Sequence, residues 1–129
     1  MGALRPSILD TSVIIAGEPY RDGLVAVSVA TLAELHFGVM LTKSADQRAE
    51  RLRRLAYIEN SFPVMPVDAR VAHSYGVLAS LVQGTGRSAR SRVMDLLIAA
   101  TAHAHGARLV TRNPEDLRGL GDVLEIVAA

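Results

Sequence analysis

Three carboxylates stand inside apolar segments of this sequence, where an isolated charge is strongly unfavourable. Asp10 follows a short apolar run, Glu34 lies within residues 29–35, and Asp95 lies within residues 93–100. Taken singly, each has a structural interpretation: Asp10 caps a helix, Asp95 caps or begins one, and Glu34 pairs with an arginine. Taken together, they are explained more economically by one shared cation. Hard cations such as Mg²⁺ or Mn²⁺ take oxygen ligands, so the pattern predicts a metal site made of carboxylates.

A fourth carboxylate, Asp116, lies in the segment 111–117. Its structural interpretation is a charge in the first turn of a short helix, where the helix dipole favours an acid. We expect Asn113 to cap that helix, and its side-chain oxygen is suited to orient a water or a metal ligand. The four histidines lack the HExxH spacing of a zinc site, so they are interpreted as structural or surface residues.

The composition of the chain limits the chemistry further. The 129 residues include no cysteine, which excludes disulfides, thiolate zinc sites and a cysteine nucleophile. The 14 basic and 13 acidic residues give a net charge of +1, so the chain as a whole has no attraction for a polyanion. Arginines close to the acids are a local exception and are candidate phosphate contacts, the alternative being solvated surface charge. They are Arg87, Arg90, Arg92 and Arg112.

The sequence predicts one cytoplasmic domain spanning residues 1–129. No apolar stretch reaches the roughly 20 residues that a membrane span requires. Asp10 interrupts the only apolar run near the N-terminus, which argues against a signal peptide. Half of the residues are apolar, which argues against disorder.

Strands and helices alternate along the chain. Apolar runs predict strands at residues 7–9, 24–28, 108–111 and 123–127, and an edge strand or extended loop at 62–67. Helical spacing covers residues 31–41, 45–60, 68–83 and 93–105, with shorter helices beginning near Asp10 and Asn113. This alternation predicts an α/β fold around a parallel sheet, in which sites form at the carboxyl ends of the strands. Asp10, Glu34 and Asp116 are therefore expected to converge.

Four segments, in this order and spacing, resemble the PIN-domain ribonucleases, and among them the VapC-type toxins of toxin–antitoxin modules. They are Ile8-Leu9-Asp10-Thr11-Ser12, Val29 to Leu35 with Glu34, Asp95 to Ala102, and Leu109 to Leu117. The resemblance implies a three-layer α/β/α sandwich with a mainly parallel five-stranded sheet. It also implies an Mg²⁺- or Mn²⁺-dependent endoribonuclease that hydrolyses RNA with a metal-activated water.

The resemblance also implies roles for particular residues. Asp10 and Asp95 are the principal metal ligands, and Glu34 and Asp116 complete the catalytic set directly or through water. Many relatives carry an acid where this chain has Asn113, so the fourth metal ligand is either Asp116 or that amide. The supporting residues are Thr11, Ser12, Thr111 and Asn113.

The resemblance further implies protein partners. A VapB-type antitoxin would cover the site, and the toxin would form a homodimer within a larger hetero-oligomer. Two other functions stay open at this point. One is a catalytically inactive PIN-like module that binds RNA or protein. The other is a receiver-like domain with Asp10 as phospho-acceptor, although Lys43, the only lysine, lies far from any strand end.

Overall fold

Five short strands pair in parallel, in the order β3-β2-β1-β4-β5. The computed structural model describes residues 5–17 and 23–129. The strands are β1 (Ser7–Leu9), β2 (Val25–Ser28), β3 (Val64–Met65), β4 (Arg108–Thr111) and β5 (Ile126–Ala128). The predicted parallel sheet is thus confirmed, with β3 as an edge strand. The predicted start of the last strand at Val123 is wrong, because the amides of Val123 and Leu124 both bond back to the Leu120 carbonyl in a turn.

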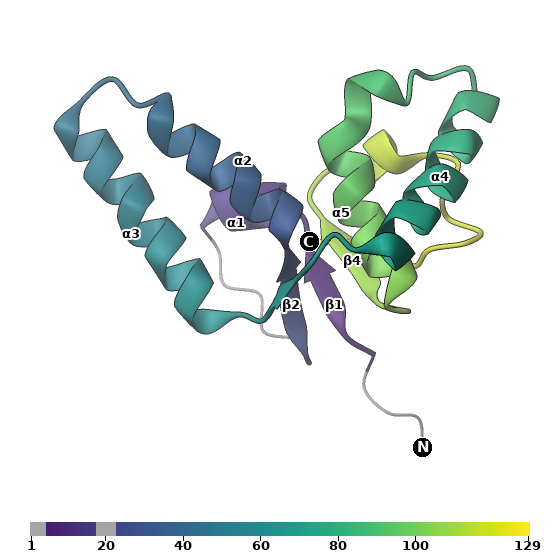
Figure 1. The fold of residues 1–129 in the computed structure, drawn as a ribbon, viewed down its shortest axis with the longest axis horizontal. Helices are drawn as coiled ribbons and strands as arrows, with labels where there is room; N and C mark the ends of the chain where they lie inside the picture. The colour runs from purple at the N-terminus through teal and green to yellow at the C-terminus, as the bar shows by residue number, and fades with distance from the viewer. Residues whose placement is uncertain (1–4, 18–22) are drawn as a thin grey trace.

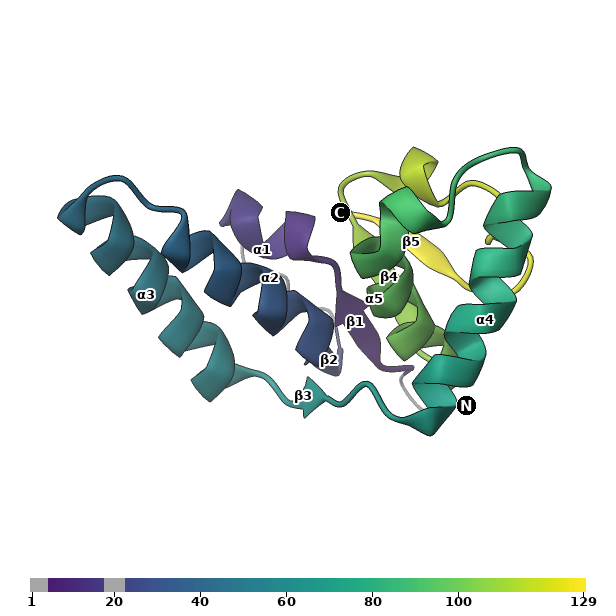
Figure 2. The same cartoon turned by 45° about the horizontal axis from the view of Figure 1, so that its top comes forward.

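The helices lie on both faces of this sheet (Figures 1 and 2). Alternate strand residues face opposite sides, so Ile8 packs among the buried residues that include Leu78 of α4 and Ile98 of α5, whereas Leu9 packs with Val13 and Leu35. The result is the expected α/β/α sandwich. The helical elements are α1 (Thr11–Ala16), α2 (Val29–Met40), α3 (Ala45–Ser61), α4 (Ala69–Gly84), η1 (Arg90–Arg92), α5 (Val93–Ala104) and η2 (Pro114–Leu117).

The helix ends follow local rules that the sequence made visible. The Asp68 carboxylate accepts a hydrogen bond from the Val71 amide and begins α4. After α5, Gly106 has a φ of +61°, a left-handed conformation that suits glycine. Within the described ranges, no helix is long and apolar enough to cross a membrane.

The hairpin of α2 and α3 projects away from the sheet (Figure 1). Arg51 of α3 donates a hydrogen bond of 2.6 Å to the Gly38 carbonyl of α2 and so links the two helices. Leu55 and Ile58 of α3 face the core, but other large apolar side chains of this helix do not. Leu52 is 47% exposed and Tyr57 is 53% exposed.

Candidate active site

One cavity of about 240 Å³ lies at the carboxyl ends of the strands and collects the predicted residues. Because β1 and β4 are parallel neighbours, the residues that follow them meet at one edge of the sheet. The four acids and the four supporting residues named from the sequence all line this cavity, and their catalytic roles stay predictions. Its lining is Asp10, Thr11, Ser12, Ile15, Glu34, Asp95, Thr111, Asn113, Asp116 and Leu117.

Asp10 is held by two hydroxyl groups from different elements. Ser12 Oγ donates to Asp10 Oδ2 at 2.6 Å, and Thr111 Oγ1 donates to the same oxygen at 3.0 Å. Both hydroxyls also accept backbone amides, Ser12 from Arg112 and Thr111 from Asn113, each at 3.1 Å. Asp10 is also the N-cap of α1. The Asp10 carboxylate therefore caps α1 and lines the cavity at the same time. Thr111, at the end of β4, fixes its position.

Glu34 is hydrogen-bonded to a threonine. The alternative considered from the sequence, an ion pair between Glu34 and an arginine, is therefore not what holds this side chain. Thr11 Oγ1 donates to Glu34 Oε1 at 2.7 Å, and the same hydroxyl lies 3.2 Å from Thr31 Oγ1. Both threonines are buried. Thr31 was missed in the sequence, although it precedes Glu34 by three residues and so shares its side of the helix.

Asp95 lies in the first turn of α5 and carries the clearest electrostatic sign of a site. Burial raises its pKa above the ordinary value of 3.8, and the negative charges of Asp10, Glu34 and Asp116 raise that pKa further. Arg92 acts in the opposite direction. The other three acids are thus close enough to Asp95 to disfavour its ionisation.

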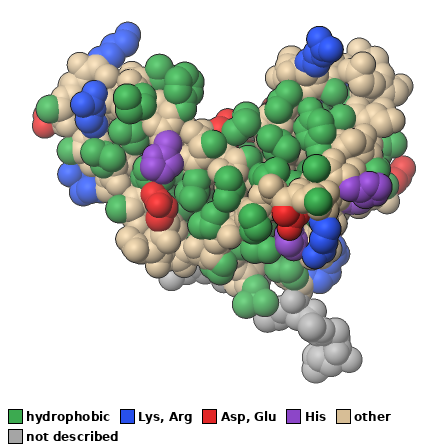
Figure 3. Space-filling view, viewed as in Figure 1, with side chains coloured by type: hydrophobic (Ala, Val, Ile, Leu, Met, Phe, Trp, Pro, Cys, Tyr) green, Lys and Arg blue, Asp and Glu red, His purple; other side chains and the backbone are tan. Residues whose placement is uncertain are grey.

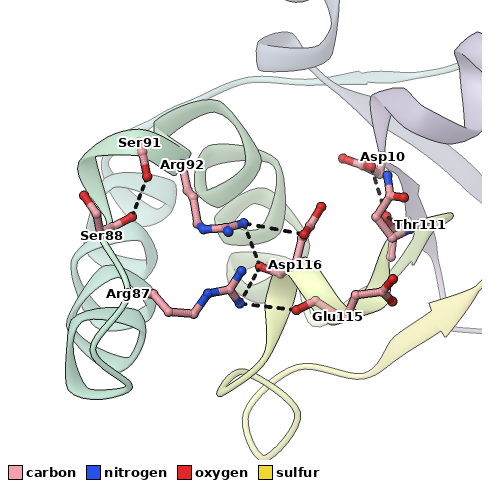
Figure 4. A network of polar contacts seen from close by, with 9 residues as sticks. Asp10, Arg87, Ser88, Ser91, Arg92, Thr111, Glu115 and Asp116 are labelled. Atoms are coloured by element: carbon pink, nitrogen blue, oxygen red, sulfur yellow. Dashed lines mark hydrogen bonds and ion pairs between the residues drawn. The ribbon is translucent and has the colours of Figure 1, made fainter.

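Asp116 contacts two arginines of the segment that precedes α5 (Figure 4). Arg92 Nη1 lies 3.9 Å from Asp116 Oδ1 and donates to the Asp116 carbonyl at 3.2 Å. Arg87 Nη1 donates to the carbonyls of Glu115 and Asp116, at 3.2 and 3.3 Å. Arg87 and Arg92, which were predicted to contact RNA, therefore also bind the protein itself.

The expectation that the Asn113 side chain caps the short helix is wrong. Asn113 occupies the N-cap position of η2, but its side chain makes no capping hydrogen bond. The Asp116 amide, which such a cap would satisfy, instead donates to the Asn113 backbone carbonyl at 3.1 Å. The side-chain amide of Asn113 therefore lines the cavity without closing the turn.

A second cavity, of about 380 Å³, adjoins the first. Glu34 and Asp95 line both cavities, so these two acids form the wall between them. The remaining lining of the second cavity comes from the segment that leads into α5, and it includes two of the predicted RNA-binding arginines. These residues are Arg90, Ser91, Arg92, Val93 and Met94.

Comparison with known proteins identifies the family. Residues 7–121 match the PIN domain. This chain belongs to the PIN-domain family. Its relatives include ribonuclease VapC5 of Mycobacterium tuberculosis H37Rv, 36% identical over 115 residues that cover 84% of this chain and 83% of the relative. Ribonuclease VapC4 of the same strain is 33% identical over 129 residues, covering 93% of this chain and 95% of the relative.

Solved structures agree with the fold of this PIN domain. A crystal structure from the VapBC family of toxin–antitoxin systems, VapBC-5 of M. tuberculosis, has a TM-score of 0.80 and 31% identity, covering 98% of this chain and all of that one. FitAcB of Neisseria gonorrhoeae has a TM-score of 0.73 and 26% identity, covering 94% of this chain and 96% of that one. The three-layer architecture expected from the resemblance is therefore confirmed.

The donor set of this PIN domain suits a hard divalent cation. The four acids, an amide and three hydroxyls supply oxygen ligands almost exclusively, and the charges of Asp10, Glu34 and Asp116 disfavour the ionised form of Asp95. Among residues 5–17 and 23–129, no three carboxylates or histidines are close enough to hold one ion as they stand. Mg²⁺ is commonly held by one or two carboxylates with water completing its coordination, so this donor set fits the ion without a cage of three carboxylates.

Proposed function

We propose that this chain is a metal-dependent endoribonuclease and the toxin of a toxin–antitoxin pair. The observation that carries the proposal is one cavity lined by Asp10, Glu34, Asp95 and Asp116, in which burial and then repulsion by the other three acids raise the pKa of Asp95. A cavity of this kind favours a divalent cation together with an anionic substrate. The names of the relatives, ribonuclease VapC5 and VapC4, support RNA as that substrate.

Asp10, Asp95 and Asp116 are the residues that would hold Mg²⁺ or Mn²⁺, with Glu34 beside them. When bound, such an ion offsets the negative charge of a phosphate and makes a water molecule more acidic. Ser12 and Thr111 keep Asp10 in one orientation by donating to the same carboxylate oxygen. Thr11 holds Glu34 by Oε1, which fits the second oxygen to accept a proton from the attacking water. Water adds to phosphorus, and the bond to the leaving ribose oxygen breaks.

The surface around the cavity supports a polyanionic substrate and a protein partner. Arg90 and Arg112 are exposed close to the acids, and we assign these two arginines to RNA phosphates. Figure 3 shows hydrophobic side chains along the hollow between the projecting hairpin and the opposite half. Large apolar side chains on the hairpin, such as Phe37 and Met40, are exposed.

Such an apolar surface favours a covering protein, which we propose to be a VapB-type antitoxin. The VapBC-5 structure from M. tuberculosis, which this chain resembles over almost its whole length, supports that partner. We further propose that the toxin is a homodimer within a larger hetero-oligomer with its antitoxin. Growth arrest on expression, relieved by the product of the adjacent gene, tests the toxin assignment separately from the chemistry.

The chemistry is tested by incubating the purified chain with structured RNA and Mg²⁺ or Mn²⁺. We expect cleavage that stops with EDTA and that is lost in Asp10→Asn and Asp95→Asn, both of which must still unfold cooperatively. Asp122→Asn is the matched control, because Asp122 is an exposed acid outside the cavity. Cleavage that persists in EDTA, or that is equal in Asp95→Asn and the unaltered chain, would overturn the proposal.

A further inference from the structure

The three arginines of segment 87–92 differ in their contacts. Arg87 and Arg92 direct guanidinium donors at η2, with three hydrogen bonds to its backbone carbonyls between them. Arg90 is exposed and lines the second cavity, and in the described part of the chain it makes no hydrogen bond or ion pair. Three residues of the same type, close in sequence, therefore have two different environments.

These contacts link the η2 segment to the segment that precedes α5. The η2 segment is one 3₁₀ turn of four residues, in which only Leu117 is buried. A turn this short has little stability of its own, because few hydrogen bonds offset the cost of ordering its backbone. Hydrogen bonds from a charged donor are among the stronger ones, so the two guanidinium groups supply much of what fixes the turn. Asp116 is carried by this turn, and its carboxylate lies at the cavity (Figure 4).

Arg92 is also placed to act on the charges of the cavity. Its side chain is only 24% exposed, and its guanidinium reaches Asp116 Oδ1 at 3.9 Å. The same group counteracts the rise in the pKa of Asp95. One arginine thus serves the two acids that come from different segments, the start of α5 and η2.

We propose that Arg92, with the help of Arg87, is a positioning residue that holds Asp116 at the cavity, while Arg90 contacts an RNA phosphate in the second cavity. The assignment rests on the proposed function, because Asp116 is taken to serve cleavage. It replaces the simpler scheme in which all three arginines contact RNA. Arg90 is suited to the substrate because it is exposed and lines a cavity that shares Glu34 and Asp95 with the proposed cleavage site.

The two roles give different responses to substitution. Affinity for single-stranded RNA is measured against salt concentration in an Asp10→Asn background, which does not cleave. Arg90→Ala should lower the salt slope by about 0.7, as expected when the protein neutralises one phosphate fewer. Arg92→Ala should leave that slope unchanged. In a chain with Asp10 intact, it should lower kcat by about tenfold, the usual effect of removing a group that orients a functional residue. Arg92→Lys should recover part of this activity, since it keeps the charge.

A double-substitution experiment tests whether Arg92 acts through Asp116. If it does, Arg92→Ala should lower kcat in the unaltered chain but have no further effect on kcat in Asp116→Ala. Arg118→Ala is the matched control, because Arg118 is an exposed arginine that directly follows η2. A reduced RNA salt slope in Arg92→Ala, or an equal fall in kcat in the presence and absence of Asp116, would overturn the proposal.

A readout without RNA separates this inference from the proposed function. Hydrogen exchange of the backbone amides of residues 115–118 should become faster in Arg92→Ala and Arg87→Ala, and stay unchanged in Arg90→Ala. A chain that does not cleave RNA would refute the proposed function and leave this exchange difference intact. Equal exchange in Arg92→Ala and the unaltered chain would refute the positioning role, even if the chain cleaves RNA.

Discussion

The hydrogen bond between Thr11 and Glu34 offers a quantitative test of how the site is built. Thr11→Val keeps the shape of a buried side chain and removes the hydroxyl that donates to Glu34 Oε1 at 2.7 Å. The carboxylate is then left facing a methyl group. We expect the free energy of unfolding to fall and RNA cleavage to slow, because the hydroxyl that orients Glu34 is gone.

The size of this effect follows from the type of hydrogen bond. Hydrogen bonds to charged groups contribute about 1.5–3 kcal/mol, and Glu34 is only partly buried, so water replaces part of this stabilisation. We therefore expect Thr11→Val to lower the free energy of unfolding by about 1–2 kcal/mol. For a chain of 129 residues, an unfolding entropy of about 2.1 cal/mol/K per residue converts this into a fall in Tm of roughly 4–7 °C.

The assay is denaturant and thermal unfolding of Thr11→Val, Glu34→Gln and the double variant. The two single effects should not add, with a coupling of about 1 kcal/mol, because Thr11→Val removes the hydrogen bond and Glu34→Gln removes the charge that strengthens it. Thr85→Val is a matched control, since Thr85 Oγ1 also donates at 2.7 Å but to the neutral carbonyl of Val82. If Thr11→Val costs no more than Thr85→Val and shows no coupling to Glu34, the assigned strength of this bond is wrong.

Three further predictions follow from the same structure. Asp95→Asn should raise the free energy of unfolding in metal-free buffer at neutral pH. Folding raises the pKa of Asp95 above 3.8. The unaltered chain should therefore lose stability relative to the variant as pH rises from about 4 through that raised pKa. Parallel profiles of unfolding free energy against pH would contradict this. The same variant should bind RNA more tightly than the unaltered chain in EDTA, since one repelling charge is gone, and equal affinities in a filter-binding titration would refute the repulsion. Gly119→Ala should lower Tm, because φ is +95° and the added Cβ would lie 2.8 Å from Thr85 Cγ2. The left-handed backbone alone costs about 1–2 kcal/mol, whereas Gly121→Ala, with open space around its Cβ, is the control.

The convergence of the acids could be predicted because neighbouring parallel strands end at the same edge of a sheet. Asp10 follows β1 directly, and Thr111 ends the neighbouring parallel strand β4, so the sheet brings both to one edge whatever the side chains do. Asp95 was visible as a charge within an apolar helical segment. The sandwich followed from alternating strands and helices, since both faces of a parallel sheet must be covered.

The hydrogen bonds that orient the acids were not predictable in the same way. Arg92 reaches Asp116 across 24 residues, and a long flexible side chain has no spacing pattern that names its partner. The Thr11–Glu34 bond joins two helices whose relative rotation depends on packing. The start of β5 was missed because Val123 and Leu124 are apolar residues next to the strand, but their amides are used in a turn.

The distribution of charge explains how a nearly neutral chain can serve a polyanion. The net charge of +1 says nothing about where the acids and bases lie. Four acids line one cavity, and two of the nearby arginines bind η2. RNA approaching this edge therefore meets carboxylates first, and repulsion disfavours it. Neutralising those carboxylates removes the repulsion and leaves Arg90 beside them to attract phosphate. In this arrangement, substrate affinity depends on the charge state of the site that performs the reaction.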